Sequence, residues 1–71
     1  MDQKHISAME NIHKKHSDID DFINEIVCYI KENDISDDTF FEWWDEVDSS
    51  NGSSFLNDMV QIAEGWDFHF D

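Results

Sequence analysis

Residues 36–48 read S-D-D-T-F-F-E-W-W-D-E-V-D, and aromatic and acidic side chains are sorted there with the period of an α-helix. At about 100° per residue, one arc holds apolar side chains that need a core: Phe40, Trp43, Trp44 and Val47. The opposite arc is filled with acids: Asp37, Asp38, Glu42, Asp45, Glu46 and Asp48. Phe41 points into this acidic side, and Ser36 is a good N-cap. The stretch therefore predicts an amphipathic helix over 37–48 with one aromatic among its outward carboxylates.

Two segments before this stretch also have helical periodicity. The first, 5–15, places three apolar side chains on one side: Ile6, Met9 and Ile12. The second, 18–33, follows Ser17 as its N-cap and has the strongest signal in the chain, through Ile19, Phe22, Ile23, Ile26, Val27 and Ile30. Only a short link separates it from 37–48, so we expect these two helices to pack as neighbours.

The C-terminal part of the chain predicts one more helix and an extended tail. Residues 54–64 have helical spacing, with Ser53 or Ser54 as the cap and Gly65 at the end. The tail 66–71, W-D-F-H-F-D, alternates with period two and therefore predicts an extended segment. Such a tail drapes its aromatics over the helices, pairs with its twin in a homodimer, or serves as a docking peptide. The predicted fold is a single all-α domain, 1–71: a bundle of three to four helices with a short extended C-terminal segment.

Charge is the dominant property of the composition. The 71 residues include eighteen acids and four lysines, with no arginine, and the net charge is −14. A small domain is soluble at a net charge of magnitude about 2–8, so the excess favours a basic partner and disfavours nucleic acid or an anionic membrane. The single cysteine, Cys28, forms no internal disulfide, no long apolar run is present, and from the polar residues 1–10 we expect no signal peptide. We therefore expect a cytoplasmic protein.

Motifs for catalysis or cofactor binding are absent from the sequence. Cys28 lies between Glu25 and Glu32, whose negative charge raises a thiol pKa, so we expect a partly exposed, unreactive thiol. His13 and His16 have no third ligand for a metal, and no segment fits the calcium-loop pattern. We expect no enzymatic activity, no cofactor and no dedicated metal site.

In size, charge and lack of catalytic motifs the chain resembles the small acidic proteins that phages make to subdue their hosts, and D-D-T-F-F-E-W-W-D-E-V-D is the densest stretch of this resemblance. Such DNA mimics inhibit restriction enzymes, CRISPR effectors or HU-type nucleoid proteins. The resemblance implies an inhibitor in the host cytoplasm that competes with DNA for a basic DNA-binding surface. Two acidic helices are expected to present the contacts: Asp18, Asp21, Glu25, Glu32, Asp37, Asp38, Phe41, Glu42, Asp45, Glu46 and Asp48.

Two further functions stay open. The run from Ile26 to Ile35 is similar to a helix end, I-x-x-Y-x-x-E-N-x-I, of late-transcription coactivators of T-even-type phages. That resemblance implies binding to RNA polymerase, with the tail 66–71 docking on the sliding clamp. A third possibility is an immunity protein for a basic nuclease toxin, which the charge fits equally well.

Overall fold

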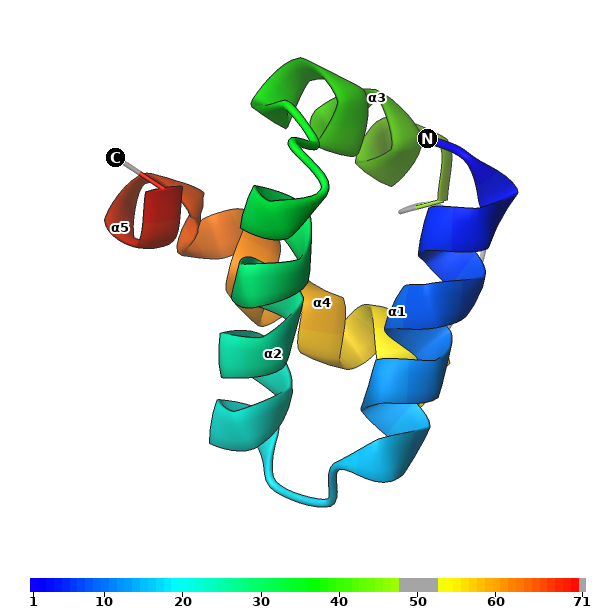
Figure 1. The fold of residues 1–71 in the computed structure, drawn as a ribbon, viewed down its shortest axis with the longest axis vertical. Helices are drawn as coiled ribbons and strands as arrows, with labels where there is room; N and C mark the ends of the chain where they lie inside the picture. The colour runs from blue at the N-terminus through cyan, green and yellow to red at the C-terminus, as the bar shows by residue number, and fades with distance from the viewer. Residues whose placement is uncertain (48–52, 71) are drawn as a thin grey trace.

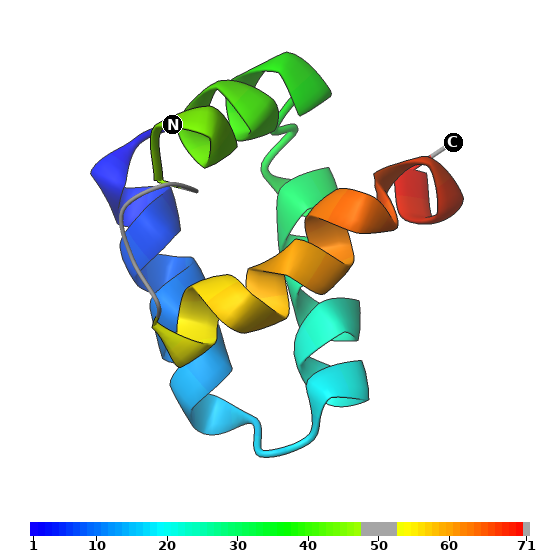
Figure 2. The same ribbon diagram turned by 180° about the vertical axis from the view of Figure 1, so that it is seen from behind.

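The computed structural model describes residues 1–47 and 53–70, and the regular structure in these two ranges is helical throughout. The helices are α1 (Gln3–Lys15), α2 (Ile19–Glu32), α3 (Asp37–Val47), α4 (Ser54–Glu64) and α5 (Trp66–Phe70). Figure 1 shows α1 and α2 side by side, with α3 lying across one end of the pair. Figure 2, which views the molecule from the opposite side, shows α4 crossing in front of α1 and α2. The predicted all-α fold is confirmed, and α1 to α4 correspond to the four predicted helices.

The helix starts follow the capping side chains closely. Ser36 Oγ accepts a hydrogen bond from the Thr39 amide at 3.2 Å, and Ser53 Oγ accepts one from Leu56 at 3.2 Å. Ser17 was predicted to cap α2, but this prediction is wrong by one residue. The cap is Asp18, whose carboxylate accepts a hydrogen bond from the Asp20 amide at 2.8 Å. An aspartate caps as well as a serine and adds negative charge at the positive end of the helix dipole.

A Schellman motif ends α2 and sets the direction of the chain toward α3. The Ile35 amide donates to the Ile30 carbonyl at 3.1 Å, and the Asp34 amide donates to Lys31 at 3.3 Å. Asp34 has φ of 56°, in the left-handed region where this motif usually places glycine. The link from α2 to α3 is therefore a defined turn.

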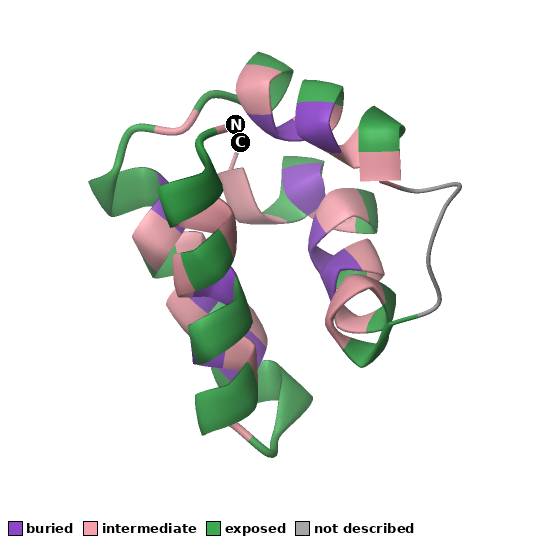
Figure 3. Cartoon of the chain, turned by 90° about the vertical axis from the view of Figure 1, so that its right-hand side faces the viewer, coloured by how far each residue is buried: buried purple, intermediate pink, exposed green. Residues whose placement is uncertain are grey.

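Every helix contributes to one apolar core. Its buried members are Met9 and Ile12 of α1, Phe22, Ile26 and Ile30 of α2, Phe40 and Trp43 of α3, Met59 and Ile62 of α4, and Trp66 of α5. Figure 3 shows these buried positions on the inward sides of the helices, with exposed positions outside. The predicted inward stripe of α3 is confirmed, since Trp44 and Val47 also pack against the core. Ile19, predicted to be inward, is 39% exposed at the first residue of α2.

Helices α2 and α3, which were expected to pack as neighbours, share the core but meet at the end of α2. The closest backbone packing joins α1 to α2, α2 to α4 and α4 to α5. Helix α3 lies across the end of α2 (Figure 1). It reaches the core through the large rings of Phe40 and Trp43. The Phe40 ring stacks on Trp66 with centroids 4.6 Å apart. Aromatic side chains of this size hold the α3 backbone away from its neighbours.

The predicted extended tail is also wrong, because residues 66–70 form the short helix α5. Trp66 and Phe70 are four residues apart and share one helical face, and their ring centroids lie 4.1 Å apart. Trp66 is buried and Phe70 packs against the core, whereas Phe68 is 89% exposed. Two of the three tail aromatics therefore cover the helices. Among the described residues, no helix combines the length and the apolar character that crossing a membrane needs.

Candidate acidic interface

Most of the acidic side chains that the structure describes face solvent, without a cationic partner among the described residues. Of the eighteen acids, Asp48 and Asp71 lie outside the described residues. Two others, Glu25 and Asp58, are half-buried and form ion pairs with lysine or histidine. Each of the remaining fourteen is exposed and has no ion pair within the described ranges. The chain thus separates a few structural carboxylates from a large unpaired set.

Helix α3 carries the densest part of this unpaired set, which we call the α3 acidic face: Asp37, Asp38, Glu42, Asp45 and Glu46. All five are exposed, whereas Phe40 and Trp43 of the same helix are buried. Asp37 and Asp38 lie in the first turn, where the helix dipole stabilises negative charge. The Asp37 carboxylate also accepts a hydrogen bond from the Asp38 amide at 2.9 Å. The structure therefore brings the five predicted α3 acids that it describes onto one surface.

The predicted acids of α2 are placed less uniformly. Asp21 and Glu32 are exposed and unpaired within the described ranges, and Asp18 is exposed but serves as the N-cap. Glu25 accepts a hydrogen bond from Lys15 Nζ at 2.7 Å and lies 2.7 Å from His16 Nε2. These two bonds, that from Lys15 first, lower the pKa of the Glu25 carboxyl. Glu25, predicted as a partner contact, thus already has two partners within the chain and joins the end of α1 to α2.

The two acidic helices do not present parallel rows of charge. Since α3 lies across the end of α2, their outer faces meet at a corner (Figures 1 and 2). Two exposed acids near this corner, Asp34 in the link and Asp67 in α5, were missed by the sequence analysis. No local signal marks Asp67, because its place depends on how α5 docks.

Phe41 does not stand among the carboxylates, and the prediction of its orientation is wrong. Its ring is half-buried and contacts Trp66 edge to face, with centroids 5.2 Å apart. The cause is α5, which covers that side of α3. The exposed aromatic is Phe68, which the period-two interpretation had placed beside Trp66 and Phe70. A helical interpretation of the tail would have separated Phe68 from the other two.

The histidines near α1 have structural partners. His5 Nδ1 lies 2.7 Å from the Tyr29 hydroxyl, and His13 Nε2 lies 2.7 Å from a carboxylate oxygen of Asp58. With the His16–Glu25 pair, these contacts join the α1 segment to both α2 and α4. Among the described residues, no three histidine, cysteine or acidic side chains gather so that they would hold a metal ion. Cys28 is exposed, as predicted.

The chemistry of the α3 acidic face is that of hydrogen-bond acceptors with negative charge. Ionised carboxylates accept hydrogen bonds and attract lysine and arginine, and arginine binds them in a bidentate fork. Such a surface suits a partner that is rich in cationic donors, as proteins that grip a phosphate backbone are. Comparisons of this chain with protein-family models, with curated proteins and with solved structures found no match.

Proposed function

We propose that this protein is an inhibitor that occupies the DNA-binding surface of a basic host protein and thereby competes with DNA. The observation that carries the proposal is the α3 acidic face, a row of exposed carboxylates with no cationic partner in the described ranges. A row of unpaired charges costs stability through self-repulsion, and a binding role explains why the chain keeps it. The resemblance to small acidic phage proteins supports the same function.

The charge density of α3 can be compared with that of duplex DNA. An eleven-residue helix is about 16 Å long, at 1.5 Å per residue. A duplex of this length carries about nine or ten phosphates. The five carboxylates of the α3 acidic face supply about half of that density. We therefore expect α3 to be the centre of the contact, with neighbouring acids such as Glu32 extending it.

The partner is expected among the DNA-binding proteins that the resemblance implies: an HU-type nucleoid protein, a restriction enzyme or a CRISPR effector. Its association with this chain should be fast and should weaken steeply with salt, because unpaired charges steer the encounter. An immunity protein for a nuclease toxin would use the same surface, so a basic nuclease belongs in the same panel of candidate partners.

The test is competition with a labelled DNA duplex, measured by fluorescence anisotropy for each protein of the panel. Glu42→Lys with Asp45→Lys reverses two charges in the α3 acidic face. The matched control, Glu10→Lys with Glu64→Lys, makes the same change in net charge at two exposed acids of α1 and α4. We expect the α3 variant to lose at least about tenfold in competition, equivalent to about 1.4 kcal/mol, and the control to lose much less.

The control separates a local contact from a general effect of charge. Equal losses in the two variants would mean that only net charge matters and would contradict an α3 contact. If the wild type displaces DNA from no protein of the panel, the proposed function itself is contradicted. Circular dichroism of both variants checks that the helices are retained.

The exposed ring of Phe68 favours a second candidate, the late-transcription coactivator. A phenylalanine that is 89% exposed beside Asp67 is a suitable docking group for an apolar pocket with a basic rim. In that case the immobilised wild-type protein should retain RNA polymerase or sliding clamp, even at high salt. Phe68→Ala should abolish this retention. If Phe68→Ala binds both as wild type does, the tail is not the docking element.

A further inference from the structure

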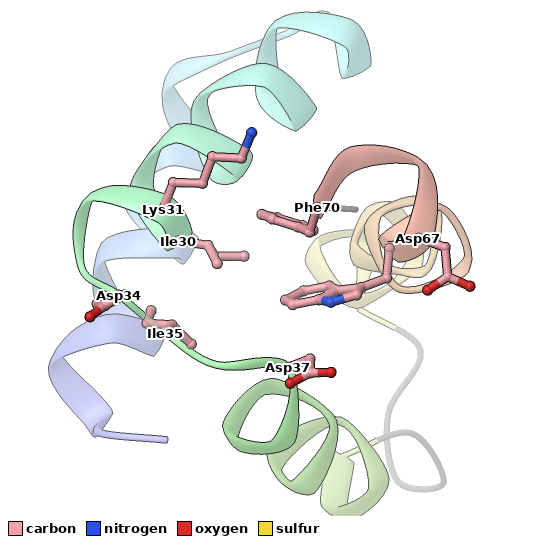
Figure 4. A pocket seen from close by; sticks show the side chains of 8 residues that line it. Ile30, Lys31, Asp34, Ile35, Asp37, Asp67 and Phe70 are labelled. Carbon is pink, nitrogen blue, oxygen red and sulfur yellow. The ribbon is translucent and has the colours of Figure 1, made fainter.

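A cavity of about 440 Å³ opens where the end of α2, the α2–α3 link, the start of α3 and α5 meet. Four apolar side chains line it, Ile30 and Ile35 on one side and Trp66 and Phe70 on the other, although most of its accessible surface is polar. Figure 4 shows the side chains of Ile30 and Phe70 pointing toward one another across the opening. The volume lies within the range of about 300–1,000 Å³ that is typical of ligand pockets. We call it the α2–α5 cavity.

The rim of the α2–α5 cavity is strongly acidic. Three aspartates border it, Asp34, Asp37 and Asp67, against a single lysine, Lys31. All three acids are exposed and none has an ion pair within the described ranges. In Figure 4, Asp37 lies at the lower edge of the opening, and Asp34 and Asp67 turn outward on its two flanks. A pocket that offers apolar side chains beneath an acidic rim suits a ligand that combines an aliphatic stem with a positive charge.

Lys31 shows which wall of the cavity attracts a cation. Its Nζ atom lies 5.7 Å from the centroid of the Phe70 ring, within the range of a cation–π contact. The ammonium pairs with no carboxylate in the described ranges, although acids are abundant nearby. Trp66 and Phe70 together form a wall of two rings, whose planes differ by 33°. The ring wall thus attracts a positive group independently of the acidic rim.

We propose that the α2–α5 cavity receives one arginine side chain of the basic partner, an identification of the partner that rests on the proposed function. The methylene stem packs against Ile30 and Ile35, and the guanidinium lies on the ring wall within reach of Asp37. Arginine fits better than lysine, because a planar guanidinium both stacks on rings and binds a carboxylate with two donors. Lys31 is exposed, and the incoming arginine replaces its ammonium on the Phe70 ring.

The binding of a model ligand tests this site without a partner protein. Nα-acetyl-arginine amide is titrated into the full ¹⁵N-labelled chain, and backbone amide and Trp66 indole signals are followed by NMR. We expect saturable shifts around Ile35, Asp37 and Phe70, with a Kd on the order of 1 mM, as suits one side chain. Nα-acetyl-citrulline amide has nearly the same shape but no charge, and it should bind at least tenfold more weakly. Equal binding of the two ligands would overturn the proposal.

Variants then locate the site. Asp37→Asn and Phe70→Leu should each weaken arginine amide binding by about three- to tenfold, as expected for one charge-assisted bond or one ring contact. Asp20→Asn, which removes the same charge at an exposed position near the far end of α2, is the matched control. Equal weakening by Asp37→Asn and Asp20→Asn, or shifts spread evenly over all the acidic helices, would overturn the proposal. The spectrum of each variant also shows whether it is folded.

The failure of this inference can be told apart from failure of the proposed function. If the protein displaces DNA through the α3 acidic face while arginine amide does not bind, the cavity proposal is wrong and the function stands. If arginine amide binds at the α2–α5 cavity but no DNA is displaced from any protein of the panel, the proposed partner is wrong and the cavity keeps its ligand.

Discussion

The backbone of Asp34 is in the left-handed region, which residues with a Cβ atom rarely adopt. Among the described residues other than glycine, it alone has a positive φ, and it occupies the position in a Schellman motif where glycine is common. Aspartate tolerates the left-handed region better than most residues, and a β-branched residue does so poorly. The turn between α2 and α3 therefore depends on the identity of one residue.

Substitutions at Asp34 should change the free energy of unfolding in opposite directions. Asp34→Val should lower it by about 1–2 kcal/mol, because a branched Cβ clashes in this conformation. Asp34→Gly should raise it by about 0.5 kcal/mol, since the relief of strain slightly exceeds the entropy that glycine loses on folding. Urea denaturation followed by circular dichroism measures both. Equal stability of the two variants would mean that the turn does not require the left-handed conformation.

At the scale of elements, α5 is small but its contribution to the core is large. Trp66 is 9% exposed and contacts the rings of Phe40, Phe41 and Phe70. Truncation of a buried tryptophan to alanine typically costs about 3–5 kcal/mol. A chain of this size has a total stability of about 4–11 kcal/mol. The five residues of α5 are thus a necessary part of the domain.

Two alanine substitutions in α5 test this point. Trp66→Ala should lower the free energy of unfolding by about 3–5 kcal/mol, a large share of the total stability. Phe68→Ala, two residues away on the exposed side, should change it by no more than about 0.5 kcal/mol. Denaturation curves of both variants give the comparison. A small effect of Trp66→Ala, or a large effect of Phe68→Ala, would contradict the position of α5 against the core.

The elements also show what the sequence can and cannot predict. The helical period correctly located α2, α3 and α4, because each is amphipathic over eleven or more residues. It failed for the tail, because Trp66 and Phe70 share a face in a helix as well as in a strand, and six residues are too few to separate the two periods. It failed for Phe41, since a helical wheel does not reveal that α5 covers that side of α3.

The same limit applies to the candidate site. The α3 acidic face was predicted in full for its described residues, because a helix fixes which of its own side chains share a face. The ion pairs of Glu25 were not foreseen, because its partners, Lys15 and His16, come from the preceding helix end. Asp67 was missed because α5 brings it to the corner between α2 and α3. Contacts within one helix follow from its sequence pattern, whereas contacts between helices depend on how the helices pack.

At the scale of the whole molecule, electrostatic repulsion acts across the entire domain. The Cα atoms span only 28 × 26 × 23 Å and the chain carries a net charge of −14. At about 0.01 M ionic strength the Debye length is about 30 Å, so each charge acts on every other. At about 0.1 M it falls to about 10 Å, and only neighbouring charges interact. The fourteen exposed acids without an ion pair in the described ranges outnumber the three ion pairs found there.

Salt should therefore stabilise the fold, in contrast to its expected effect on the complex. Between about 0.01 and 0.5 M NaCl, screening should relieve about 1 kcal/mol of repulsion and raise the Tm by about 4–8 °C. The variant with Glu10→Lys and Glu64→Lys has four fewer net negative charges, so its Tm should rise less over the same range. Calorimetry of both proteins gives the measurement.

A Tm that falls with salt would mean that the Lys15 and histidine ion pairs outweigh the repulsion, and the cost attributed to the α3 acidic face would not exist. A rise in Tm together with loss of binding at the same salt concentration would show that one set of charges destabilises the free protein and holds the partner.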